Sequence, residues 1–241
     1  MVAERASRTL LASALGATLL AAASAAWAGR PLSTEDAGAI GARTCQLESW
    51  TERAAAARTW VLAPACGVTS EFEIDGSYAL PDEQTLVRAE AELALKYVPA
   101  DAHLATALGS VDFALKATYA LERPTKAAWR GSEASAWLVA SWRPSDAWAI
   151  HANLGTSRDR STGSTAAGLN LALTWVPRSD VLLFIEGQDN ARHEIFGPSQ
   201  RSAGARYWLI GDRLALDVSA IRAAGEPTLW TLGLGWYGLA F

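Results

Sequence analysis

The sequence has few of the residues that enzymes commonly use for catalysis. Its 241 residues include three histidines and two cysteines, and it contains no GxSxG, HExxH or CxxC motif. His193 lies close to Asp189 in the chain, and such a pair could activate a water molecule. A solvated loop histidine is the commoner state of such a residue. The sequence therefore predicts neither an enzyme nor a metal or cofactor site, with a hydrolase that uses His193 as an alternative.

Beyond residue 28 the sequence also lacks the run of about 18 apolar residues that a membrane-spanning helix needs. The start of the chain has the form of a secretory signal: Arg5 and Arg8 precede an apolar stretch over 10–26. Ala26-Trp27-Ala28 then matches a signal-peptidase site. We expect a signal peptide at 1–28 that is cleaved before Gly29, and an uncleaved anchor is the alternative.

An excess of positive charge is missing as well. The formal net charge is −4, and removing Glu4, Arg5 and Arg8 with the signal leaves 19 basic and 24 acidic residues. This balance gives no reason to expect nucleic-acid binding.

What the sequence does contain is alternation of apolar and polar residues. From Val87 to Tyr97 the odd positions are apolar, and charged residues occupy most of the positions between them. The same alternation recurs in 111–121, 148–154, 167–175 and 214–220. A period of two is typical of β-strands with one apolar face, whereas a helix shows spacings of three and four.

Turn residues divide the chain into about twelve expected strands, with ten as the alternative. The expected ranges are 44–53, 57–64, 69–80, 85–98, 104–121, 132–143, 147–156, 165–175, 181–188, 200–210, 214–222 and 228–241. For the segment 44–64 the sequence allows two arrangements, two barrel strands or a periplasmic extension.

Short and long connections alternate along the chain. Turns at 99–101, 144–146, 177–180 and 211–212 are short, whereas 122–131, 157–164 and 189–199 are longer and polar. Outer-membrane barrels show this pattern, with short periplasmic turns and long outer loops. The sequence predicts an all-β protein: a single up-and-down antiparallel transmembrane β-barrel over 44–241, preceded by a periplasmic segment over 29–43. A water-soluble, aromatic-rich sandwich is the alternative.

Aromatic residues are expected near both ends of the strands. Tyr97, Trp142 and Trp175 each precede a Pro-Asp turn, and Trp148 follows one. Toward the opposite strand ends lie Tyr78, Tyr119, Trp137 and Trp230. Two aromatic girdles are typical of a barrel surrounded by lipid.

The chain ends on an aromatic residue, Phe241. Because an unpaired strand edge is costly in hydrocarbon, we expect the last strand to pair with the first and close the barrel. The terminal strand resembles the signal that engages the outer-membrane barrel-assembly machinery, so that machinery and outer-membrane lipid are the expected partners. The apolar pattern changes phase between Trp236 and Tyr237, which predicts a bulge at Gly235 or Gly238.

The two cysteines test the register of the first hairpin. The numbers of Cys45 and Cys66 sum to 111, as do those of Arg53 and Arg58 beside the expected turn. Residues of constant sum face each other in an antiparallel pair, so the sequence predicts a structural disulfide in an oxidising compartment.

The polar residues that alternate with the apolar ones along each strand should face the lumen. The candidates are Glu73, Asp75, Arg88, Glu90, Glu92, Lys96, Asp112, Lys116, Arg143, His151, Arg206 and Asp217. Mutually paired, they would occlude a narrow barrel; alternatively, they would line a water-filled path. The sequence therefore predicts passive transport or binding of small molecules, with a structural or surface-interaction barrel as the alternative.

The start of the expected mature chain carries a family resemblance. Residues 29–38 read GRPLSTEDAG, and residues 45–48 read CQLE. This is similar to the outer-membrane transporters associated with the meta-pathway of phenol degradation, in which an RPL-T-D-A segment precedes a QLE first strand. The resemblance implies an outer-membrane β-barrel that handles small apolar or aromatic compounds. The cysteine pair is an addition to that pattern.

Overall fold

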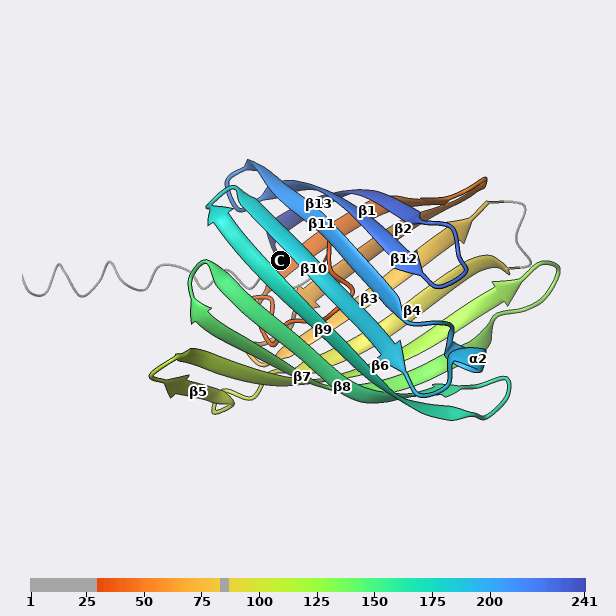
Figure 1. Cartoon of the computed structure of the whole chain (residues 1–241), viewed down its shortest axis with the longest axis horizontal. Coiled ribbons are helices and arrows are strands. Elements are labelled where there is room, and N and C mark those ends of the chain that lie inside the picture. The colour runs from red at the N-terminus through yellow and green to blue at the C-terminus, as the bar shows by residue number, and fades with distance from the viewer. Residues whose placement is uncertain (1–29, 83–86) are drawn as a thin grey trace, which may run out of the picture.

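The computed structural model describes residues 30–82 and 87–241. In these residues one antiparallel sheet curls into a barrel (Figure 1). The expected signal peptide at 1–28 lies outside the described residues. No helix in the described part of the chain is long and apolar enough to cross a membrane.

In the part of the chain that the structure describes, thirteen strands and one short helix make up the fold. They are β1 (Thr44–Ala54), β2 (Ala57–Gly67), β3 (Phe72–Pro81), β4 (Val87–Tyr97), β5 (His103–Thr106), β6 (Gly109–Pro124), β7 (Arg130–Ser145), β8 (Trp148–Asp159), β9 (Thr165–Arg178), β10 (Val181–Asn190), α2 (His193–Phe196), β11 (Gln200–Ile210), β12 (Leu214–Ala223) and β13 (Leu229–Ala240).

Two pairings close the sheet into a ring. β1 pairs with β13, as expected for the first and last strands of a barrel. β4 pairs with β6 and bypasses the four-residue β5, so that twelve of the thirteen strands form the closed barrel. Closure leaves no free edge in the ring, which is the arrangement that hydrocarbon surroundings require.

One expected strand was wrong. The range 104–121 is divided between β5 and β6 by a tight hairpin at residues 107–108. Gly109 has a φ of 103°, a conformation that glycine adopts without steric cost. The hydroxyl of Thr106 also donates to the carbonyl of Gly109 at 2.8 Å. These local contacts reverse the chain, and the large apolar residues change parity across the turn, from Leu104 and Leu108 to Val111 and Phe113.

The two faces of the barrel have opposite character. Outward side chains are large and apolar: Leu93 is 61% exposed, Leu154 60% and Leu232 56%. Inward side chains include Lys96 at 0% and Asp217 at 2%. A water-soluble protein buries its apolar face, so this inverted arrangement is the one expected of a barrel in lipid and disfavours the sandwich.

The phase change near the C-terminus comes one residue later than the sequence suggested. Cys45 pairs with Leu239 but Leu47 pairs with Trp236, so a bulge lies at Tyr237 and Gly238. Gly238 has a φ of 70° and is one of the two glycines expected to host it. Tyr237 therefore stays on the inward face, where it is 9% exposed, rather than joining the outward apolar stripe.

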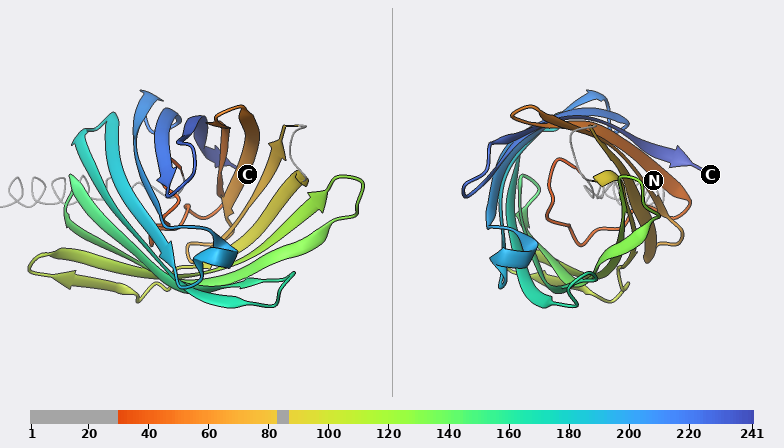
Figure 2. Two further views of the ribbon diagram at one scale, coloured as in Figure 1. Left: turned by 45° about the vertical axis from the view of Figure 1, so that its right-hand side comes forward. Right: turned by 90° about the vertical axis from the view of Figure 1, so that its right-hand side faces the viewer.

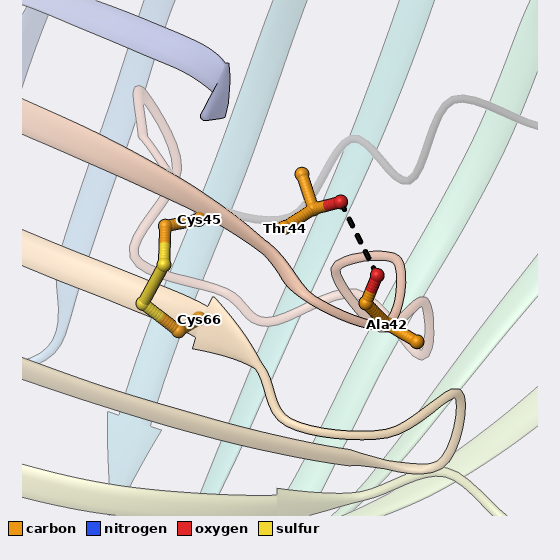
Figure 3. Close-up of a disulfide and its surroundings, with 4 residues drawn as sticks. All are labelled: Ala42, Thr44, Cys45 and Cys66. Carbon is orange, nitrogen blue, oxygen red and sulfur yellow. Dashed lines mark hydrogen bonds between the residues drawn. A yellow bond between two sulfur atoms is a disulfide. The ribbon is translucent and has the colours of Figure 1, made fainter. Parts of the chain in front are cut away.

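The expected register of the first hairpin is confirmed. Every pair between β1 and β2 sums to 111, including Cys45 with Cys66. The two cysteines form a disulfide near the end of the barrel where the chain enters β1 (Figure 3). Beside it, the Thr44 hydroxyl donates to the carbonyl of Ala42 at 3.4 Å.

We expect the paired substitution Cys45→Ser and Cys66→Ser to leave a folded but less stable barrel. The crosslink closes a loop with a sequence separation of 21, and loop-closure entropy then contributes about 3 kcal/mol. The measurement is the temperature at which detergent-extracted protein loses its heat-modifiable migration on a denaturing gel. An unchanged temperature would contradict the expected contribution, and absence of any heat-modifiable band in the parent protein would contradict the closed barrel.

Candidate functional site

The lumen contains a segment of the chain itself. Residues 30–43 lie inside the ring of strands, as the view along the barrel shows (Figure 2, right). The sequence placed residues 29–43 outside the barrel as a periplasmic segment, and for residues 30–43 the structure differs. The physical reason is that inward-facing polar groups need hydrogen-bonding partners, and the segment supplies them. We call residues 30–43 the lumen segment.

The first residue of the lumen segment joins the wall where the barrel closes. The backbone N–H of Arg30 donates to Glu48 of β1 at 3.1 Å. Its guanidinium lies 3.4 Å from Asp217 of β12, contacts the Thr231 hydroxyl, and stacks over Trp50 at 4.3 Å. A buried arginine is expected to have several such partners.

A second arginine completes this cluster from β11. The Arg206 guanidinium is 2% exposed and lies 3.1 Å from Glu48 and 3.4 Å from Asp217. It also lies 5.0 Å from the centre of the Tyr237 ring, whose hydroxyl donates to Glu48. Two guanidinium groups thus face two carboxylates, so the buried charges balance.

The carboxylate of Glu186 on β10 anchors the next turn of the lumen segment. It accepts hydrogen bonds from the backbone N–H of Ser33, at 3.0 and 3.2 Å, and from the N–H of Thr34 at 2.9 Å. The Thr34 hydroxyl donates at 2.9 Å, and the Ser202 hydroxyl of β11 donates at 2.6 Å. Charge-assisted bonds of this kind are stronger than neutral ones, so Glu186 holds the segment firmly.

Glu35 bridges two lysines that would otherwise repel each other. Lys96 of β4 and Lys116 of β6 are direct partners in the sheet, and like charges in that position are destabilising. The Glu35 carboxylate lies 3.3 Å from Lys96 and bonds to Lys116. Lys116 also lies 3.1 Å from Asp75 of β3, and Lys96 lies 3.6 Å from Asp36.

These lysines set the protonation of Glu35. Burial alone would raise the pKa of the Glu35 carboxyl, but the charges and hydrogen bonds of Lys116 and Lys96 outweigh it and lower the pKa from 4.5 to about 2. Glu35 is therefore ionised at every physiological pH.

Three further wall side chains bind the backbone of the lumen segment. Asn153 of β8 accepts from the N–H of Glu35 at 2.8 Å and donates to its carbonyl at 2.9 Å. The Ser141 hydroxyl of β7 accepts from the N–H of Ala37 at 2.8 Å. Glu73 of β3 accepts from the N–H of Ile40 at 2.9 Å. The segment is thereby attached around most of the circumference of the barrel.

The lumen segment separates two cavities. One of about 300 Å³ lies toward the end that carries the longer loops, and its lining includes Ser33 and Glu35. The other, of about 640 Å³, lies toward the end with the short turns, and its lining includes Ala37 and Gly38. We call them the loop-side cavity and the turn-side cavity. The segment thus narrows the lumen between two hollow chambers.

The predicted lumen residues lie at four levels along the barrel. Glu73, Asp75, Lys96, Lys116, His151, Arg206 and Asp217 surround the lumen segment. Asp112 and Arg143 pair with each other and line the turn-side cavity, where His103 lies 2.6 Å from Asp112. Glu92 lines the loop-side cavity. Glu90 faces Glu122 near the loop end, and Arg88 is exposed beside a bulge there.

Sequence reasoning missed several residues of this arrangement. Glu48 and Thr231 share the inward parity of their strands, so alternation could have found them. Arg30, Glu35 and Asp36 carried no periodic signal, because their segment is not a strand. Trp137 was assigned to an outer aromatic girdle, but it shares parity with Ser141 and lines the loop-side cavity.

The loop histidine lies near two possible partners. His193 Nε2 is 2.7 Å from Asp189 Oδ1, and the Ser199 hydroxyl donates to the same carboxylate oxygen at 2.7 Å. The His193 and Asp189 side chains are more than half exposed. The Ser199 hydroxyl lies farther from His193 Nε2, at 3.5 Å, so its closer hydrogen-bonding partner is the aspartate. In residues 30–82 and 87–241 no group of three acidic, histidine or cysteine residues could hold a metal ion.

The twelve-stranded closed ring with apolar outside and polar inside defines a porin-like barrel. The KdgM porin has a TM-score of 0.60 with this chain, at 10% identity over 79% of this chain and 98% of that one. The NanC porin has a TM-score of 0.57, at 7% identity over 80% of this chain and 98% of that one. The COG4313 outer membrane channel from Pseudomonas putida F1 has a TM-score of 0.55, at 11% identity over 86% of this chain and 99% of that one. At these identities the likeness concerns the fold.

The family follows from the sequence itself. Residues 16–235 match the model of the family described as uncharacterised conserved protein UCP029691, and the chain belongs to that family. A search of curated proteins gives no match.

We expect Lys116→Met to loosen the lumen segment. The substitution leaves Glu35 and Asp75 without their shared cation, and breaking a fully buried pair costs about 3–5 kcal/mol. Because Glu35 remains 26% exposed, we expect a smaller loss of about 1–3 kcal/mol. Cleavage at Glu35 by a glutamate-specific protease should become faster. Arg160→Met, at an exposed loop position, is the control; equal cleavage rates in both variants would contradict the bridging role.

The Glu35 pKa also predicts how acid affects the lumen segment. Because its folded pKa lies below 4.5, the ion pairs contribute fully above that pH and are lost as the pH falls through about 2. The backbone N–H of Glu35, bound to the non-titrating Asn153, should therefore stay protected from hydrogen exchange at pH 4. The measurement is deuterium uptake at pH 7, 5 and 4, corrected for intrinsic rates. Loss of protection between pH 5 and 4 would contradict the lowered pKa.

Proposed function

We propose that this protein is a channel of the bacterial outer membrane through which small molecules pass passively, with the lumen segment restricting the path. The observation that carries the proposal is a closed barrel with an apolar outer face and a polar lumen that is hollow on both sides of residues 30–43. Porins of the same fold support this reading.

The partners proposed for the outer surface follow from its chemistry. Outward leucines and tryptophans suit hydrocarbon and its interface, so outer-membrane lipid would surround the barrel. We further propose that β13, which ends beside the exposed Phe241, engages the barrel-assembly machinery. Its pairing with β1 would then be the last step of closure.

For the solute, the loop-side cavity favours polar compounds. Its lining includes Glu92, Lys116, Asn153 and Asn170, with Trp137 as the large apolar side chain. The similarity of residues 30–37 to phenol-pathway transporters suggests small aromatic compounds instead. Those residues lie inside the lumen, so whichever solute passes would contact them, and aromatic compounds belong in any transport assay.

A structural barrel with an occluded lumen is the second candidate. The observation that favours it is the number of buried bonds that attach the lumen segment to the wall, above all at Glu186, Glu48 and Lys116. In that case the segment would act as a permanent internal support. The hydrolase alternative has less support, because His193 is exposed and bonded to Asp189.

Single-channel recording in planar bilayers tests the proposal. We expect small, stable conductance steps for the parent protein, and at least twofold larger steps for Lys116→Met, because the loosened segment widens the path. Arg160→Met should match the parent.

Two results decide between the candidates. Silent bilayers for both the parent and Lys116→Met, with heat-modifiable protein present, would overturn the channel and favour the structural barrel. Conductance that is equal in the two proteins would retain the channel but remove the restricting role of the lumen segment.

A further inference from the structure

An indole ring forms a flat part of the wall of the loop-side cavity. Trp137 points inward from β7 and lies across the backbones of β8 and β9. A Cβ added to Gly155 or Gly168 would lie 2.6 or 2.7 Å from ring atoms, so only glycine allows the ring to lie so close. The indole N–H donates to Ser135 at 3.0 Å, which fixes the ring orientation. With one face against the wall, the ring presents its other face to the cavity that it lines.

Polar side chains with free hydrogen-bonding capacity surround that ring. Glu92, Thr118, Glu133, Asn170 and Gln188 line the same cavity from four further positions on the wall and from β7 itself. None of these five side chains has a hydrogen bond to another residue in the described part of the chain. Lys116, by contrast, is already bonded to Glu35 and Asp75. The cavity therefore offers two carboxylates as acceptors and two amides that both donate and accept.

We propose that the loop-side cavity is a binding site for uncharged sugars of the size of one pyranose ring. This inference rests on the proposed channel and names its solute class. Every sugar hydroxyl both donates and accepts, so it can satisfy the carboxylates and the amides together. The C–H face of the ring can pack on the indole face, as apolar surface does on aromatic rings. A volume of about 300 Å³ accommodates one ring, and an adjoining cavity of about 210 Å³ shares Trp137, Asn170 and Gln188.

Charge selects among possible solutes. Glu35, Glu92 and Glu133 face the cavity against the single cation Lys116, so an anionic sugar would be repelled. A quaternary ammonium ion would be attracted to the indole face. Even with one hydroxyl, as in choline, it could satisfy few of these groups at once, so most hydrogen bonds of the carboxylates and of the Asn170 and Gln188 amides would stay unmade. An uncharged polyol meets both demands.

Ligand-observed NMR on the full-length protein in detergent micelles tests this site, with methyl glucoside, glucuronate and choline as probes. We expect saturable binding of the glucoside, and at least tenfold weaker binding of glucuronate and of choline. Trp137→Leu should weaken glucoside binding at least tenfold, while Trp137→Phe retains part of it. Gln188→Ala should weaken it severalfold. Trp230→Leu, at an outward position, is the matched control and should bind as the parent does.

The outcomes separate this inference from the channel itself. Heat-modifiable migration confirms that each variant is folded before binding is compared. No saturable glucoside binding, equal or tighter binding of choline or glucuronate, or an undiminished affinity in Trp137→Leu would overturn the sugar site even if the protein conducts. Selective glucoside binding by a protein that is silent in bilayers would support the site and count against passage.

Discussion

The whole structure depends on the need of backbone amides for partners when no water is present. In hydrocarbon a strand can satisfy its N–H and C=O groups only through neighbouring strands, so the sheet has to close. Closure by β1 with β13 and by β4 with β6 meets that need. It also directs every second side chain into an enclosed lumen, where polar side chains need hydrogen-bonding partners.

The lumen segment supplies those hydrogen-bonding partners. Glu186, Glu73 and Ser141 face inward from separate strands, and each accepts a hydrogen bond from a backbone N–H of residues 33–40. The segment has no regular secondary structure of its own, so its N–H groups are available to the wall. A non-strand conformation is thus what allows fourteen residues, 30–43, to serve wall positions far apart around the barrel. The same bonds divide the lumen into two cavities and place a charged bridge, Glu35, between facing lysines.

Close approach of aromatic rings to glycine shapes the remaining space. Trp137 lies over Gly155 and Gly168, Phe184 over Gly204, and Tyr237 over Gly235. In each case a small residue on one strand gives room for a ring from a neighbouring position, a known device for packing glycines in sheets. Tyr237 also lines a cavity, but its hydroxyl is bonded to Glu48, whereas Trp137 lines the loop-side cavity among polar side chains that have no hydrogen bond to another described residue. That difference makes it a candidate for solute contact as well as a packing residue.

The sequence by itself determined most of the strands, most of their outward faces and the register of the first hairpin, because side chains in a sheet alternate and antiparallel partners have a constant sum. Cys45 and Cys66 were paired by that rule alone. Only the tertiary structure decided where residues 30–43 lie, because their bonds join positions more than a hundred residues apart, such as Ser33 and Glu186. It also decided the side of Trp137 and of Tyr237. Aromatic residues suit both a lipid interface and a glycine-lined wall, so the neighbours across the sheet determine which of the two they contact.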